Sequence, residues 1–194
     1  MRGLIDAHLW DDGLSVYSNR FANGSFYPRI TPTSFYPLLA GAATAERATS
    51  IIEHWLFNAS RFCVTPAGDF KGNSDSCYWG LPSISADDPA FPPLGYWRGF
   101  VWGPMALLTY WGLAHPAYAT LPLVAKARAA LCAQMEALFL RQWRLNRHVC
   151  ENFSPRKFGT VGRTGDNSTE CTGMHFYHWG ALTGFIGLLE AGFY

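Results

Sequence analysis

The amino-acid sequence predicts an all-α fold in which helical hairpins pack side by side and long loops gather on one face. Apolar residues recur at the three- and four-residue spacing of a buried helix face in several stretches. Two long segments rich in Pro, Gly and polar residues interrupt those stretches, whereas the other links are short. Long loops in a compact domain are usually functional, so this asymmetry predicts one face that carries the function.

The first predicted elements are a helix end and a small hairpin. Residues 4–10 are typical of the end of a helix, which Asp11-Asp12-Gly13 stops. Apolar and polar residues alternate weakly over 14–18 and 26–29, on either side of Asn23-Gly24. Such a pattern around an Asn-Gly pair predicts a small β-hairpin near the N-terminus.

Two helices are predicted next. Thr31-Pro32-Thr33 supplies capping and first-turn residues for a helix that begins at Thr33 and runs to Leu39. Thr44 is the expected cap of the following helix. The inward face of that helix is read from its apolar spacing as Ala48, Ile51, Ile52, Trp55 and Leu56.

Three helices follow, over 101–114, 122–146 and 176–189. The first is apolar nearly all round and is expected to be buried on most sides. The last contains several glycines, which suit close helix packing. The long middle helix is amphipathic, and its expected inward residues are Leu123, Ala127, Ala130, Leu131, Met135, Leu138 and Trp143.

The two long loops cover residues 58–99 and 148–174. Both are rich in Gly and polar residues and lack a helical or strand period. The first contains aromatic residues that argue against disorder, namely Phe70, Tyr78, Trp79, Phe91, Tyr96 and Trp97.

Composition excludes several classes of protein. Hydrophobic residues make up 49% of the chain, charged residues 15%, and the formal net charge is +1, so neither a disordered chain nor a broad nucleic-acid interface is expected. The most apolar stretch, 100–114, is shorter than the ~20 residues of a membrane span. No signal peptide is visible, and the chain opens abruptly, as if within an element.

Cysteine and histidine placement predicts neither a metal site nor a cofactor. The five cysteines include no C-x-x-C pair, and the six histidines are dispersed without an H-E-x-x-H helix. Buried free thiols are the expected state, although a disulfide between Cys150 and Cys171 remains open. Asn-x-Ser/Thr tripeptides occur several times but arise often by chance, so the compartment is left unassigned.

The candidate chemistry lies where three loop segments enter apolar helices: residues 81–91, 96–104, and 151–155 with 175–182. A carboxylate in such a mouth, with aromatic walls and an arginine, suits glycoside hydrolysis. One carboxyl protonates the leaving oxygen, and another activates water or attacks directly. Glu151 is the candidate carboxylate of the third segment.

Each candidate also has a purely structural interpretation. The tryptophans at helix starts could be core residues, and Arg98 could pair with Asp87 or Asp88 to tie two loops together. Asp88 before Pro89 could serve only the turn, and His178 could pack or cap its helix. Residue type alone leaves these alternatives open.

The segments resemble, in order, those of the six-hairpin glycosidases of the mannosyl-oligosaccharide glucosidase and mannosylglycerate hydrolase type. Residues 31–38 resemble the run S/T-P-T-S-F-Y-P-L, and 81–91 resemble the loop L-P-S-I-S-x-D-D-P-x-F. Residues 96–104 resemble Y-W-R-G-x-x-W-x-P/N, and 178–182 resemble the helix near the end of the series. Residues 151–153 match E-N-Y, with Phe in place of Tyr. The ordered set covers nearly the whole chain.

This resemblance implies an (α/α)6 toroid that hydrolyses α-linked glucosides or mannosides with inversion and without a metal. Residues 1–194 would form the C-terminal portion of a single catalytic domain of this kind. Glu151 would be the general base that activates water. The expected substrate-binding residues are Tyr96, Trp97, Arg98, Trp102, Asp88, His178 and Trp179.

The resemblance also implies that the general-acid Asp precedes the segment at 31–38, upstream of this chain. Asp11 and Asp12 do not lie in the expected motif, and Asp87 and Asp88 match the loop aspartates instead. The chain is therefore expected to be a fragment with little activity, whose partners are a carbohydrate substrate and the missing N-terminal part of the toroid.

Other interpretations remain. A trehalase-like six-hairpin enzyme is the nearest alternative within the glycosidases, although the loop at 81–91 favours the glucosidase and mannosylglycerate hydrolase group. A non-catalytic carbohydrate-binding remnant would keep the aromatic surface without the chemistry. A helical-repeat scaffold would require repeats at a fixed period, and none is visible.

Overall fold

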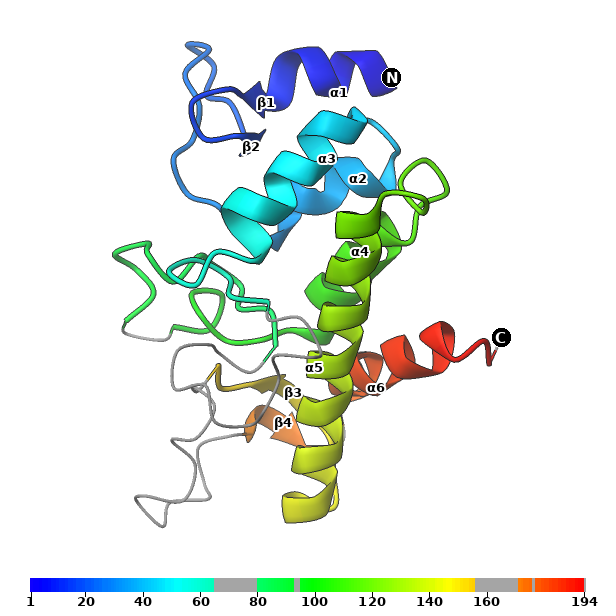
Figure 1. Cartoon of the computed structure of the whole chain (residues 1–194). Helices are drawn as coiled ribbons and strands as arrows, with labels where there is room; N and C mark the ends of the chain where they lie inside the picture. Colours follow the sequence, from blue (N-terminus) through cyan, green and yellow to red (C-terminus); the bar gives the residue numbers. More distant parts are fainter. Residues whose placement is uncertain (65–79, 93–94, 156–170, 176, 194) are drawn as a thin grey trace.

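Helices dominate the computed structural model, which describes residues 1–64, 80–92, 95–155, 171–175 and 177–193. Within these ranges it contains six α-helices and two small antiparallel sheets of two strands each. The longest helix, α5 (Pro122–Asn146), runs down much of the molecule (Figure 1), and the helices over Ala45–Ile51, Gly103–Leu113 and His178–Glu190 pack against it. The all-α expectation is therefore confirmed.

The N-terminal end is formed by α1 (Arg2–Leu9), β1 (Trp10–Asp11) and β2 (Val16–Tyr17). A small hairpin is present, as expected, but its strands differ from the predicted pair because β1 pairs with β2. The side chain of Asp11 accepts hydrogen bonds from the backbone N–H of Gly13 at 2.9 Å and of Leu14 at 3.1 Å, which closes a tight turn ahead of β2. Residues around Asn23-Gly24 contribute only an isolated bridge, between Arg20 and Phe26.

A partly buried polar contact ties this end to the rest of the fold. The Tyr17 hydroxyl donates to Asp6 at 2.6 Å, and the Arg47 guanidinium lies 2.5 Å from the same carboxylate oxygen. Burial raises the pKa of Asp6, but the hydrogen bonds from Tyr17 and Arg47 and the positive charge of Arg47 outweigh it, so the pKa lies below 3.8. The contact therefore stabilises the fold only while Asp6 is ionised.

Asp6→Asn is expected to lower the free energy of unfolding by about 1–2 kcal/mol at neutral pH. A carboxyl whose pKa falls on folding adds stability above its unfolded pKa and loses it as pH falls through the folded value. The difference between wild type and Asp6→Asn should thus be full at pH 7 and shrink below about pH 4. Urea denaturation at both pH values measures it, with the exposed Glu53→Gln as the control. A difference independent of pH would contradict the assignment.

The next segment contains a 3₁₀-helix, η1 (Pro32–Phe35), then α2 (Tyr36–Leu39), α3 (Ala45–Ile51) and a π-helical turn, η2 (Ile52–Leu56). Thr44 caps α3 as expected, because its side chain accepts from the Arg47 backbone N–H at 3.2 Å. The predicted inward face is also confirmed, since Ala48, Ile51, Ile52, Trp55 and Leu56 are all buried.

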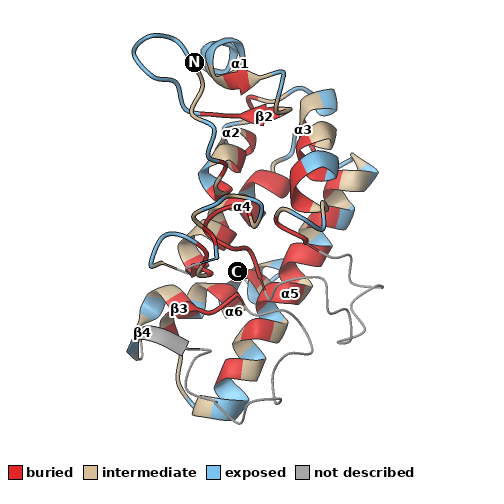
Figure 2. Ribbon diagram, turned by 90° about the vertical axis from the view of Figure 1, so that its left-hand side faces the viewer, coloured by how far each residue is buried: buried red, intermediate tan, exposed pale blue. Residues whose placement is uncertain are grey.

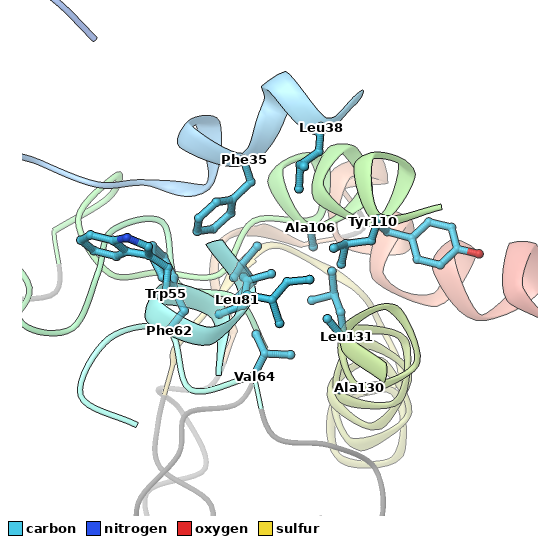
Figure 3. Packing of buried hydrophobic residues seen from close by; sticks show 14 of the residues in the cluster. Phe35, Leu38, Trp55, Phe62, Val64, Leu81, Ala106, Tyr110, Ala130 and Leu131 are labelled. Atoms are coloured by element: carbon cyan, nitrogen blue, oxygen red, sulfur yellow. The ribbon is translucent and has the colours of Figure 1, made fainter. Parts of the chain in front are cut away.

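The central core lies between these elements and the helices α4 (Gly103–Leu113) and α5. Figure 3 shows side chains from η1, α2, η2, α4 and α5 converging around Leu81, which comes from the first long loop. Leu81 is fully buried, and so are Phe62 and Val64 from the same loop. The first predicted loop therefore contributes to the core and is held against the helices by it.

α6 (His178–Glu190) packs against both α4 and α5. The Tyr110 hydroxyl of α4 donates to Glu190 at 2.7 Å, and Arg128 of α5 lies 3.2 Å from the same carboxylate, so one side chain joins three helices. The expected inward face of α5 is correct except near its C-terminal end: Trp143 is 43% exposed, whereas its neighbour Gln142 is buried. Figure 2 shows the change from buried to exposed along α5.

A second sheet lies inside the predicted loop 148–174. β3 (Cys150–Phe153) pairs antiparallel with β4 (Cys171–His175), with an irregular register between Cys150 and Asn152. Treating this stretch wholly as a loop was therefore wrong. The pairing depends on backbone hydrogen bonds, and the short strand at 150–153 has no alternating polar pattern because three of its four residues are buried.

The cysteines are not all free. Cys63 and Cys150 are each disulfide-bonded, whereas Cys132 is a buried free thiol. Burial raises the pKa of Cys132 to about 11. The general expectation of free thiols is thus wrong for the first two residues, and the side chain of Cys171, which the sequence left open as a partner of Cys150, lies outside the described part of the chain.

Candidate active site

Backbone pairing at Val101 brings the three predicted loop segments together. Val101 bridges Pro82 on one side and Phe153 on the other. Its N–H donates to the Phe153 carbonyl at 2.8 Å, and the Phe153 N–H donates back to the Val101 carbonyl at 3.0 Å. The segments at 81–91, 96–104 and 151–155 therefore meet because their backbones form one small ladder.

Gly99 and Ser83 hold two of these segments together next to the ladder. Gly99 has a φ of 125°, a left-handed conformation that favours glycine. Its N–H donates to the Ser83 hydroxyl at 2.9 Å in a buried contact, and the Ser83 N–H donates to the Phe100 carbonyl at 3.0 Å. These bonds attach the Tyr96–Gly99 turn to the first loop.

Two glycines allow the helices to approach the ladder. A Cβ at Gly103 would lie 1.9 Å from the Trp179 carbonyl oxygen, so the start of α4 contacts the start of α6 directly. A Cβ at Gly180 would lie 1.9 Å from the Cys150 carbonyl oxygen, so α6 also rests on β3. Glu151 follows Cys150 immediately, and its position therefore depends on this contact.

Among the described residues, six aromatic side chains surround this crossing, and we refer to them as the aromatic cluster. They are Tyr96, Trp97, Trp102, Tyr177, His178 and Trp179.

Trp102 forms the inner layer of the aromatic cluster. Its ring is fully buried and stacks on Trp97 with centroids 3.8 Å apart and planes 16° apart. Trp97 is 45% exposed, so this stacked pair reaches solvent at Trp97. The Trp102 indole also meets Trp179 edge-on at 5.6 Å. Trp102 thus supports Trp97 from the core side, and Trp97 is the member of the pair that reaches solvent.

Tyr177 and His178 extend the aromatic cluster at the start of α6. Their rings stack with centroids 4.9 Å apart, and Tyr177 meets Trp179 edge-on at 5.3 Å. His178 is exposed in the first turn of α6. Tyr177 was not among the residues predicted from sequence, because nothing in its pattern distinguishes it from its aromatic neighbours.

Glu151 lies beside the aromatic cluster on β3 and is partly buried. The Tyr96 hydroxyl donates a hydrogen bond to Oε1 of Glu151. The backbone N–H of Met174 on β4 donates to Oε2 at 3.2 Å. From the described part of the chain each carboxylate oxygen accepts one hydrogen bond, and a carboxylate oxygen has capacity for a further ligand or water.

The contact with Glu151 changes the acidity of Tyr96. The hydrogen bond to Glu151, then burial, and then the negative charge of Glu151 raise the pKa of the Tyr96 hydroxyl from 10.0 to about 12. Tyr96 therefore remains a neutral donor throughout the physiological range.

Asp88 and Arg98 have partners of their own. The Arg98 guanidinium packs against Gly95, where an added Cβ would lie 2.6 Å from its Nη2, and the side chain is exposed. Asp88 lies 3.4 Å from Arg29. The suggested pairing of Arg98 with Asp87 or Asp88 is replaced by these contacts and by a contact of Asp87 with Arg61 at 3.2 Å.

Asp87 and Asp88 line a separate cavity of about 400 Å³. Its walls include Trp55, whose ring lies under the Arg61 guanidinium at 3.8 Å. No residue of the aromatic cluster is among the described residues that line it. Asp88 is therefore placed in a different pocket from the surface beside Glu151.

The described residues contain neither a metal-binding cluster nor a membrane-spanning helix. No group of three or more His, Cys, Asp and Glu side chains among them is arranged to hold a metal ion. No described helix combines the length and apolar character needed to cross a bilayer.

The sequence of the chain is similar to those of a family of glycoside hydrolases. Residues 1–178 match the model of a family described as the mannosylglycerate hydrolase MGH1-like glycoside hydrolase domain. Two mannosylglycerate hydrolases of Selaginella moellendorffii are each 34% identical over 82 residues, which is 41% of this chain and 13% of theirs.

Solved structures share the fold at low sequence identity. A mannosylglycerate hydrolase from Thermus thermophilus, in complex with glucose, matches 92% of this chain at 22% identity with a TM-score of 0.61. The neutral trehalase of Saccharomyces cerevisiae matches 97% at 18% identity with a TM-score of 0.65. The chain spans 36% and 28% of these two proteins, respectively.

Proposed function

Because the chain belongs to the mannosylglycerate hydrolase MGH1-like glycoside hydrolase family, we propose that its Glu151 site hydrolyses O-glycosidic bonds in α-mannosides or α-glucosides with inversion. One observation carries this proposal. A carboxylate held by two donors is bonded to Tyr96, whose ring meets the half-exposed Trp97 edge-on at 5.6 Å, and hydrolysis of sugars requires an oriented carboxylate and a surface on which a pyranose can stack.

In the proposed mechanism Glu151 is the general base. Its carboxylate takes a proton from a water molecule while the water oxygen forms a bond to the anomeric carbon. The bond from that carbon to the leaving oxygen breaks, and the leaving oxygen takes a proton from a general acid. Because water attacks the face opposite the leaving group, an α-glycoside yields a β-sugar.

The part of the aromatic cluster around Trp97 is the proposed sugar platform. Trp97 presents the exposed ring face, His178 and Trp179 border it at the start of α6, and Trp102 supports it from below. Arg98 is exposed on the same turn and is proposed to bind substrate hydroxyls. Asp88 belongs to the separate cavity, so a direct contact with the same sugar has no support in the described residues.

The proton donor is proposed to come from outside this chain. The aromatic cluster contains neither an Asp nor a Glu, so Glu151 is the only carboxylate that the described contacts attach to it. General-acid assistance is worth about 10²–10⁴-fold in rate. The chain by itself should therefore hydrolyse unactivated α-glycosides poorly, although it contains the proposed base, Glu151.

Two alternatives follow from the same site. A carbohydrate-binding remnant would use the exposed aromatic surface without Glu151 chemistry, and the lack of a second carboxylate among the described contacts of the aromatic cluster favours it. A trehalase-like specificity would prefer glucosyl over mannosyl substrates. Both differ from the main proposal in what they predict for activated substrates.

α-Glycosyl fluorides test the proposal because fluoride leaves with little need for a proton donor. The 194-residue chain is expected to hydrolyse α-mannosyl or α-glucosyl fluoride and to release the β-sugar first, as followed by proton NMR of the anomeric signals. Mannosylglycerate and trehalose, which need the acid, should react far more slowly.

Each alternative has its own outcome in this assay. Release of the α-sugar first would contradict inversion, and binding of sugar without any fluoride release would support the non-catalytic alternative. A rate that is high only for glucosyl fluoride would favour the trehalase-like specificity. Rapid hydrolysis of mannosylglycerate by this chain would contradict the external proton donor.

A further inference from the structure

Tyr96 differs from the other exposed residues of the aromatic cluster because its hydroxyl is hydrogen-bonded to Glu151. Its ring is 48% exposed, yet its oxygen donates to Oε1 of that carboxylate. A residue that only stacked against a sugar would have no need of this bond. The bond therefore acts on Glu151.

Tyr96 is itself held by the core through Trp102. The Trp102 Nε1–H donates to the Tyr96 carbonyl oxygen at 3.0 Å, and the two rings meet edge-on with centroids 4.6 Å apart. Trp102 is fully buried, and the neighbouring Val101 is bonded to Phe153 on β3. The Tyr96 hydroxyl is thus a donor fixed relative to the strand that carries Glu151.

The two donors to Glu151 come from different elements. Tyr96 belongs to the turn before α4, whereas the Met174 N–H belongs to β4. The terminal torsion of a glutamate is broad when free, so a carboxylate held by one donor can still rotate. Donors on both oxygens, from two directions, restrict that rotation and set where the unused lone pairs point.

We propose that Tyr96 is a positioning residue that orients the Glu151 carboxylate toward the attacking water, rather than a stacking surface for the sugar. This inference rests on the proposed function of Glu151. Water must be held within a narrow range of positions for in-line attack, and a displacement of about 1 Å can cost about 100-fold in rate. The hydroxyl, and not the ring, is the part of Tyr96 that matters.

Tyr96→Phe separates these two uses because it removes the hydroxyl and keeps the ring. Hydrolysis of the α-glycosyl fluoride should show kcat lowered by about 10-fold or more, with KM nearly unchanged. Tyr27→Phe is the matched control, since Tyr27 lies outside the site and its ring packs against Phe21. Thermal unfolding of both variants shows whether they are folded.

A measurement that does not depend on turnover tests the contact itself. With ¹³C-labelled tyrosine, the Tyr96 signal is identified by its loss in Tyr96→Phe. In the lower part of the pH window between 10.0 and about 12 this tyrosine should remain mostly neutral in the wild type. In Glu151→Gln it should ionise at lower pH, because the negative charge and the strong acceptor are gone.

The outcomes distinguish this inference from the function on which it rests. Fluoride hydrolysis that is lost in Glu151→Gln but keeps its wild-type kcat in Tyr96→Phe overturns the positioning role alone. Hydrolysis absent from the wild type overturns both proposals. An unchanged Tyr96 titration in Glu151→Gln overturns the contact, and with it the positioning role, whatever the kinetics.

Discussion

Glu151→Gln is expected to lower the rate of α-glycosyl fluoride hydrolysis by about 10²–10⁴-fold, the usual contribution of a general base. The amide keeps the shape of the side chain and can still accept a hydrogen bond from Tyr96 or Met174 through its oxygen. It cannot take a proton from water at neutral pH. The loss should therefore fall on kcat, because the aromatic cluster, the proposed sugar-binding surface, is unchanged.

Glu53→Gln is the matched control for this variant. Glu53 is exposed in η2, remote in sequence from the three segments that meet at Val101. The same change of charge there should leave both kcat and KM at wild-type values. Full activity in Glu151→Gln, in a preparation with wild-type thermal unfolding, would remove Glu151 from the mechanism.

Azide provides a second test of the proposed role of Glu151 as the general base. If Glu151 only activates water, a smaller variant such as Glu151→Ala leaves room for an anion that needs no base. Added azide should then attack the anomeric carbon and displace fluoride, which forms a β-glycosyl azide. Formation of the β-glycosyl azide in Glu151→Ala, without the α-glycosyl azide, would agree with inversion. Hydrolysis restored without any azide adduct would contradict direct attack by azide.

The helices could be predicted from the sequence because their signals are local. Thr44 caps α3 and Pro122 begins α5 where the side-chain pattern places them. The error at Trp143 also has a local cause. The spacing continues to the end of α5, but this end of the helix extends beyond the core, so the outward neighbour of a buried Gln142 is left 43% exposed.

The assembly of the site could be predicted only in part. The motifs indicated that three segments converge, but not that Val101 joins them by backbone bonds to Pro82 and Phe153. Backbone pairing leaves no mark on side-chain periodicity when the strands are short and buried on both faces. The link between Tyr96 and Glu151 was missed for the same reason, since the two residues are 55 positions apart and meet only through that ladder.

Gly180 shows how strongly the position of Glu151 depends on helix packing. Gly180→Ala is expected to lower the free energy of unfolding by about 1–3 kcal/mol, the usual cost of overpacking. The added Cβ would lie 1.9 Å from the Cys150 carbonyl oxygen, and a backbone atom cannot swing aside as a side chain can. Either α6 or β3 must move, and a shift of β3 carries Glu151 with it.

Gly187→Ala is the control because it makes the same change on the same helix. There the nearest atoms to the new Cβ belong to the side chain of Glu136, at 3.8 Å, which is ordinary contact. Alanine is favoured over glycine within a helix by about 0.5–1 kcal/mol, so this variant should gain stability and keep its activity. Urea denaturation should therefore show opposite changes of stability in the two variants, and fluoride hydrolysis should fall only in Gly180→Ala. If both alanines stabilised the chain equally and left hydrolysis intact, the contact between α6 and β3 would not be what holds Glu151 in place.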